Sequence, residues 1–87
     1  MSEDLETRRR RAQFRASHRG TKEIDWLLGR FADAELGSMN GADLEMFEAL
    51  LREDDPALHD WLMYPETCEV AEYQALVTRI RNFHGLN

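Results

Sequence analysis

Apolar residues in this chain recur at helical spacing, and this periodicity limits the possible folds more than any other feature. In the clearest case the spacing is i, i+3, i+4 and i+7, which places the residues on one face of a helix. These residues are Ile24, Leu27, Leu28 and Phe31. No useful length of chain alternates apolar and polar residues with the period of two that a half-buried strand requires. The sequence therefore predicts an all-α protein.

Five helical segments follow from this spacing and from residues that start and stop helices. Gly20 ends the first segment and Thr21 caps the second. Asp55 caps the fourth segment, with Pro56 at its first helical position. Pro65 ends the fourth segment, because proline disfavours helical geometry in the residue before it. The expected helices are residues 5–17, 22–36, 42–52, the segment from 55 to just before 65, and 68–83.

These segments predict a compact five-helix bundle with short connections. A chain of 87 residues has the size of one small domain, so we expect a single helical domain over residues 1–87, with residues 1–6 frayed. No segment approaches the roughly 20 apolar residues that a membrane span needs, and the N-terminus lacks the apolar region of a signal peptide. We therefore expect no membrane insertion and a monomer when the protein is free.

Charge and cysteine content limit the partners and the compartment. Residues 1–22 carry seven basic and three acidic side chains, whereas residues 23–87 carry four basic and fourteen acidic ones. The net charge of −6 disfavours nucleic-acid binding, which requires a positive field. Cys68 is the only cysteine, so no internal disulfide forms and a reducing compartment fits. The expected location is the cytoplasm of a bacterium.

Residue patterns typical of catalysis or of cofactor binding are missing. His18, His59 and His84 lie far apart and lack metal-ligand spacing. Cys68 is read as a small apolar residue, and the many acidic pairs as solvated helix faces. An enzyme or flavin carrier in its own right would usually need a glycine-rich loop for the phosphates, and the chain has none. We expect no enzyme, no metal site and no stably bound cofactor.

The junction of the first two helices, from Arg19 through Gly20 to Glu23, admits two interpretations. In the structural one, Gly20 makes the turn, Arg19 offsets the negative end of the first helix, and Glu23 suits the positive start of the second. In the functional one, the turn presents a guanidinium and a carboxylate side by side to a partner or a phosphate. Spacing alone favours the structural interpretation.

A longer stretch around this junction resembles a known family. The residues from His18 to Phe31 (HRGTKEIDWLLGRF) resemble the signature of the succinate dehydrogenase assembly factors, also called flavinylation factors. Residues 53–62 look like that family's acidic segment with a proline and a final Trp-Leu, and residues 77–81 look like its closing helix. The resemblance extends from about Arg8 to Phe83.

The resemblance implies a chaperone-like assembly factor. Family members bind the flavoprotein subunit of succinate dehydrogenase, and in some bacteria that of fumarate reductase, and promote covalent attachment of FAD to it. FAD is then the cofactor of the client protein. The competing hypothesis is an antitoxin-like or other protein-interaction module without a role in flavinylation.

The resemblance also implies which residues bind the partner. Its R-G-x-x-E motif corresponds to Arg19, Gly20 and Glu23. Trp26 lies on the polar side of its helix, so both a docking role and a core position stay open. The basic run that begins at Arg8 either contacts the client or keeps the first helix soluble. The complete set of expected partner-binding residues is Arg8, Arg9, His18, Arg19, Gly20, Glu23, Asp25 and Trp26.

Overall fold

The computed structural model describes residues 4–86 and confirms the all-α prediction. Within these residues the chain forms five α-helices and two short 3-10 turns, and no strand is present. Residues 1–3 lie outside the described part, and Leu5 already belongs to a helix. The elements are α1 (Leu5–Ser17), α2 (Lys22–Glu35), η1 (Leu36–Ser38), α3 (Gly41–Leu50), α4 (Asp55–Met63), η2 (Pro65–Thr67) and α5 (Ala71–Phe83).

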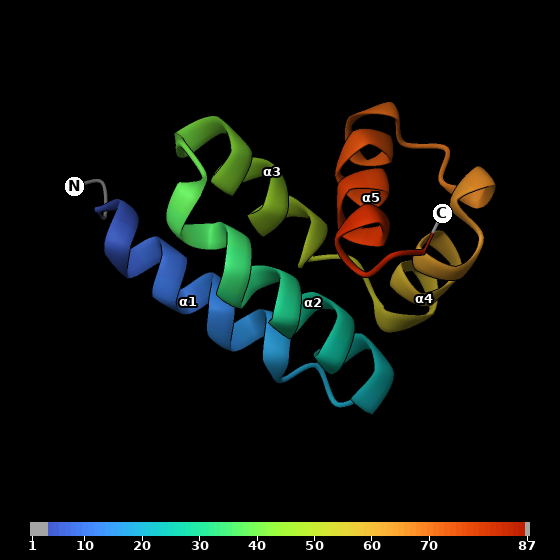
Figure 1. Ribbon diagram of the computed structural model, residues 1–87, viewed down its shortest axis with the longest axis horizontal. Helices are drawn as coiled ribbons and strands as arrows, with labels where there is room; N and C mark the ends of the chain where they lie inside the picture. Colours follow the sequence, from blue (N-terminus) through green and yellow to red (C-terminus); the bar gives the residue numbers. More distant parts are fainter. Residues whose placement is uncertain (1–3, 87) are drawn as a thin grey trace.

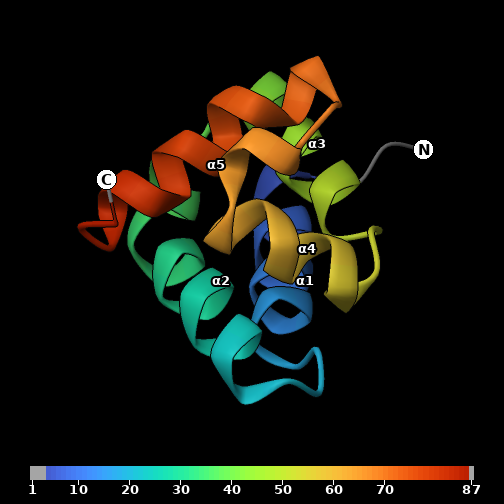
Figure 2. The ribbon, with the colours of Figure 1, turned by 90° about the vertical axis from the view of Figure 1, so that its right-hand side faces the viewer.

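The helices enclose one hydrophobic cluster. α1 and α2 run side by side in opposite directions, while α3, α4 and α5 pack against one side of this pair (Figure 1). Figure 2 shows α5 crossing above α4, α2 and α1. Phe31 of α2 lies at the centre, with its ring 5.8 Å from that of Phe47 and 5.7 Å from that of Phe83. None of the helices in residues 4–86 has the length and apolarity to cross a membrane.

Short polar side chains begin three of the helices. Asp4 Oδ1 accepts a hydrogen bond from Thr7 N at α1, and Asn40 Oδ1 accepts one from Asp43 N at α3. The prediction that Asp55 caps α4 was wrong by one residue, because Asp54 Oδ1 accepts the bond from Ala57 N. Pro56 is therefore the second helical residue of α4 and not the first as predicted, although it still stands in the first turn, where its missing N–H costs no hydrogen bond.

The predicted helix bounds are correct for α1 and wrong by one to three residues for α2, α3 and α5, with α3 running over Gly41–Leu50 and not over residues 42–52. α1 has the predicted bounds, whereas α2 ends at Glu35 and continues as the 3-10 turn η1. The prediction that the last helix starts at Cys68 was wrong by three residues. Cys68 and Val70 have extended backbone after the turn η2, so the Cys68 side chain is buried from a loop and α5 starts at Ala71.

Candidate functional site

The connection between α1 and α2 depends on a glycine. Gly20 has a backbone φ of +98°, a conformation that residues with a Cβ rarely adopt. A Cβ built at Gly20 meets no other atom within 4 Å, so the chain itself leaves open space there. The requirement for glycine within this molecule is therefore a requirement of the backbone angle. We call residues 18–23 the motif turn.

Arg19 connects the motif turn to the segment between α3 and α4. Its guanidinium donates from Nη1 to Leu51 O at 2.6 Å and from Nη2 to Glu53 O at 2.5 Å. Its Nε donates to Asp55 Oδ1 at 2.7 Å. With the Arg19 side chain only 13% exposed, all three nitrogen positions of the guanidinium are used inside the molecule. Arg19 therefore acts first as an internal support.

Two further hydrogen bonds order the turn. Asp25 Oδ1 accepts from the backbone N of Arg19 at 2.6 Å, which ties the first turn of α2 back to the connection. Thr21 Oγ1 donates to Asp55 Oδ2 at 3.2 Å instead of capping α2, so the predicted cap at Thr21 is not made by its side chain. The Asp55 carboxylate thus receives one bond from Arg19 and one from Thr21.

Glu23 presents its carboxylate at the surface. Its side chain is 53% exposed, and Glu23 Oε1 lies 3.6 Å from His59 Nε2 of α4. The other ring nitrogen, His59 Nδ1, is 3.9 Å from Asp60 Oδ1. A shallow depression lies where α2 and α4 meet, and it is lined by Thr21, Ile24, Asp55, Pro56 and His59.

His18 and Trp26 are both exposed near the turn. The His18 ring stacks on the Phe14 ring, with centroids 4.0 Å apart, and its Nδ1 is 2.8 Å from Phe14 O. Phe14 itself is 60% exposed. Trp26 is 54% exposed, so the structure places it on the surface and not in the core. An exposed indole of this size is a common feature of protein docking surfaces.

Arg8 and Arg9 lie towards the other end of α1, about 15 Å from His18 along the helix axis. Arg8 makes two bonds to the Glu48 carboxylate of α3, the shorter at 2.6 Å. Arg9 Nη2 donates to Met39 O at 2.7 Å. The structure therefore groups six of the eight expected residues at the turn, and it gives Arg8 and Arg9 contacts inside the molecule.

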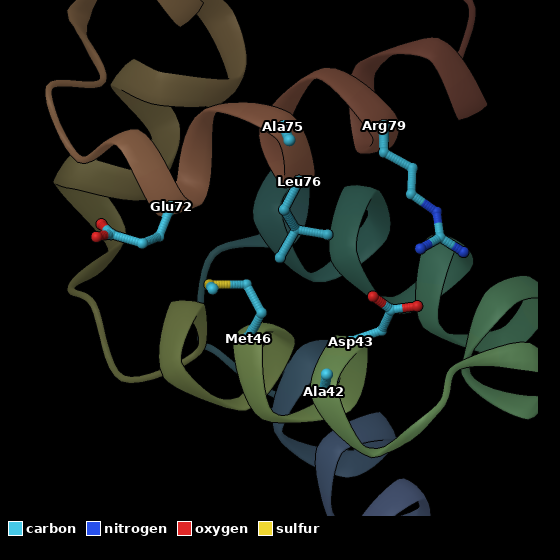
Figure 3. Close-up of a pocket in the computed structure, with 7 residues that line it drawn as sticks. All are labelled: Ala42, Asp43, Met46, Glu72, Ala75, Leu76 and Arg79. Carbon is cyan, nitrogen blue, oxygen red and sulfur yellow. The ribbon is translucent and has the colours of Figure 1, made fainter.

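A second depression lies between α3 and α5. In Figure 3, Arg79 of α5 and Asp43 of α3 extend towards each other, with Leu76 and Met46 between the two helices. The Arg79 guanidinium is already bonded to Glu35 at 2.9 Å and lies over the Phe31 ring. Within residues 4–86 no group of three or more His, Cys, Asp or Glu side chains could hold a metal ion. We therefore interpret this depression as the contact between two packed helices and not as a ligand site.

Sequence reasoning missed Asp55 and His59 as members of the site. Asp55 was assigned to helix capping, and His59 was considered only as a metal ligand. Both contact the motif turn because α4 packs near the start of α2. The available signal was the acidic segment at residues 53–55, whose carboxylates and carbonyls are natural acceptors for the Arg19 guanidinium.

The fold and the turn define a class of protein: a small helical bundle that presents an ordered, exposed polar turn beside an exposed tryptophan, as docking proteins do. The family model described as Flavinator of succinate dehydrogenase matches residues 10–84. The chain therefore belongs to the family of succinate dehydrogenase flavinators.

Relatives carry names that agree with this family. The chain is 47% identical over 60 residues to the FAD assembly factor SdhE of Acetobacter pasteurianus, covering 69% of this chain and 55% of that protein. It is 35% identical over 81 residues to the FAD assembly factor SdhE of Coxiella burnetii, covering 93% and 95% of the two chains. It is 27% identical over 85 residues to the mitochondrial succinate dehydrogenase assembly factor 2 of Dictyostelium discoideum, covering 97% of this chain and 59% of that protein. No solved structure matches the chain significantly.

Proposed function

We propose that this chain is an assembly factor that binds the flavoprotein subunit of succinate dehydrogenase and promotes the covalent attachment of FAD to it. The observation that carries the proposal is the motif turn. A chain of the flavinator family presents its R-G-x-x-E residues as an ordered turn with an exposed glycine and an exposed carboxylate. The names of the bacterial relatives, FAD assembly factors, support the same conclusion.

The eight expected residues divide into those that support the fold from inside and those that are exposed to a partner. Arg19 and Asp25 support the turn from inside, because their bonds order its backbone against α2 and the α3–α4 segment. Arg8 and Arg9 hold α1 on the body of the protein. The exposed residues that would contact the flavoprotein are His18, Gly20, Glu23 and Trp26.

The proposed help is positional and not catalytic. A partner that holds reacting groups in the productive orientation can lower a barrier by several kcal/mol without supplying a nucleophile or a base. In this proposal FAD is held by the flavoprotein, the factor binds no flavin stably, and it acts as a monomer in the cytoplasm. In this proposal the flavoprotein of fumarate reductase is a second candidate client, to be tested in the same way.

The test is the covalent flavin content of the succinate dehydrogenase flavoprotein, read as in-gel fluorescence after denaturation, with and without this gene. The band should fade without the gene and return with the intact protein. Gly20→Glu should fail to restore it, because a side chain at φ +98° is strained and places bulk and charge on the docking surface. The strain costs about 1–3 kcal/mol, too little to unfold the bundle.

The matched control is Gly37→Glu, which puts the same side chain at another glycine with open space around it, away from the turn. This variant should restore the band fully. Gly20→Ala adds the strain without the charge, and it should lie between wild type and Gly20→Glu. Loss of helical circular dichroism in Gly20→Glu would contradict the docking explanation, and an unchanged band in the gene deletion would contradict the proposed function.

A further inference from the structure

A stripe of three exposed side chains runs along the outer face of α2. Lys22, Trp26 and Arg30 stand at i, i+4 and i+8, so they follow one another along the same side of the helix. Two cations therefore flank one exposed indole. We call these three residues the α2 stripe.

The two cations of the stripe are available to a partner. Neither Lys22 nor Arg30 makes a hydrogen bond or an ion pair within residues 4–86. Arg19 and Arg79, in contrast, are each bonded to a carboxylate of the chain. Two unpaired cations on one side of a helix form a local positive patch that can attract an anionic partner.

The groove beside the stripe holds two carboxylates, each of which is hydrogen-bonded to a neutral donor of the chain. Asp25 and Asp33 line it, but Asp25 already accepts from Arg19 N at 2.6 Å, and Asp33 accepts from the Gln13 amide at 2.7 Å. Gly29 lies at the close approach of α2 to Ser17, where a Cβ would come within 3.0 Å of Ser17 Cβ. The two carboxylates of the groove therefore make hydrogen bonds inside the described part of the chain, whereas the two cations along its outer edge do not.

The indole is supported from one side. The Trp26 ring lies against the His84 imidazole, with centroids 4.8 Å apart. His84 Nε2 is in turn 2.7 Å from Leu27 O, which fixes the imidazole against α2. A supported aromatic ring loses less conformational freedom on binding than a free one, so it suits a docking anchor.

We propose that the α2 stripe docks an acidic segment of the partner flavoprotein, one in which two carboxylates lie on either side of an apolar group. The eight-residue spacing between Lys22 and Arg30 corresponds to about 12 Å along the helix. An extended segment spans about 13 Å in four residues, so the sequence acidic-x-apolar-x-acidic fits this spacing. This inference rests on the proposed function and adds the chemistry of the partner's side of the contact.

The first experiment measures binding of the purified flavoprotein subunit to the full chain and to the double reversal Lys22→Glu/Arg30→Glu. The reversal should weaken binding about 100-fold, largely through slower association. Raising the salt from about 0.05 to about 0.3 M should weaken wild-type binding and leave the reversal nearly unaffected. Trp26→Ala, which keeps the charges, should weaken binding about tenfold.

The matched control is Arg10→Glu/Arg52→Glu, which changes the net charge equally at two exposed arginines outside the stripe. It should bind within about threefold of wild type, since screening limits the effect of remote charges. Equal losses in the two double reversals would overturn the inference and leave the proposed function standing. Failure of the wild-type chain to bind the flavoprotein would contradict the proposed function itself.

A second experiment keeps the inference testable in that case. A Glu-Ala-Leu-Ala-Glu peptide is titrated into the labelled chain and followed by amide and indole NMR shifts. Shifts centred on Lys22, Trp26 and Arg30, absent with the lysine analogue of the peptide, would support it. Shifts elsewhere, none at all, or a response at the stripe to inorganic pyrophosphate but not to the peptide would overturn it.

Discussion

The first two helices lie against one another but are attached to the rest of the protein by different interactions. α2 buries six of its fourteen residues, with Phe31 fully enclosed. α1 has thirteen residues and buries only Ala12 and Ala16, while Phe14 points outwards. Arg8, together with Arg9 and Gln13, supplies what apolar burial does not, through bonds to α3, to the α2–α3 connection and to α2.

The comparison teaches that neighbouring helices of similar length can depend on different kinds of free energy. Apolar burial is non-directional and roughly proportional to area, so it tolerates small changes of shape. A hydrogen-bonded arginine depends on direction, and its removal leaves several acceptors without a partner. Removing an apolar side chain should therefore destabilise the protein most in α2, whereas removing a polar side chain should destabilise it most in α1 and the motif turn.

The largest effect is expected at the apolar side. Phe31→Ala removes the ring between Phe47 and Phe83 and should lower the free energy of unfolding by about 3–5 kcal/mol, measured by urea denaturation. The matched control is Phe14→Ala in α1, whose exposed ring should contribute less than about 0.5 kcal/mol. Equal losses for the two phenylalanines would remove the contrast between the helices.

A smaller but still large effect is expected where α1 gives way to the turn. Arg19→Ala leaves two carbonyls and Asp55 Oδ1 without their donor, so we expect a loss of about 2–3 kcal/mol in the free energy of unfolding. Arg30→Ala, at an exposed arginine without an internal partner, serves as control and should change stability by less than about 0.5 kcal/mol. If Arg19→Ala proved as mild as the control, the internal role of Arg19 would be wrong.

The smallest effect concerns the start of α1. The hydrogen bond from Thr7 N lowers the pKa of Asp4 below its ordinary value of 3.8. The ionised cap therefore stabilises the fold above the unfolded pKa, and this contribution is lost as the pH falls through the lower folded pKa. Asp4→Asn keeps a cap that does not titrate. As the pH is lowered from about 5 to about 2, only the wild type loses its cap contribution, so the melting temperature of the variant minus that of wild type should increase. A constant difference over that range would contradict the cap's role.

Sequence reasoning found what depends on near neighbours in the chain. The buried face of α2 follows from residues within seven positions of one another, and it is correct. The start of α5 was misplaced because the extended backbone at Cys68 and Val70 is set by tertiary packing after η2. The periodicity of apolar residues contains no information about such long-range packing.

The site shows the same limit. The resemblance located the motif turn, but it gave Arg19 and Glu23 the same role. Their difference depends on acceptors more than thirty positions away, at Leu51, Glu53 and Asp55. Which of two charged neighbours faces inwards is decided only when α4 has packed against α2.

The bonds of Arg19 make the order of the motif turn a property of the closed tertiary structure. A chain in which the α3–α4 segment has not reached Arg19 lacks the support that orders this turn. Docking and folding are then linked equilibria: a partner present at about 100 times its dissociation constant stabilises the folded chain by about 2.7 kcal/mol. By the same linkage, a core substitution such as Phe31→Ala lowers the apparent affinity for the partner in proportion to the unfolded fraction, although no contact residue has changed.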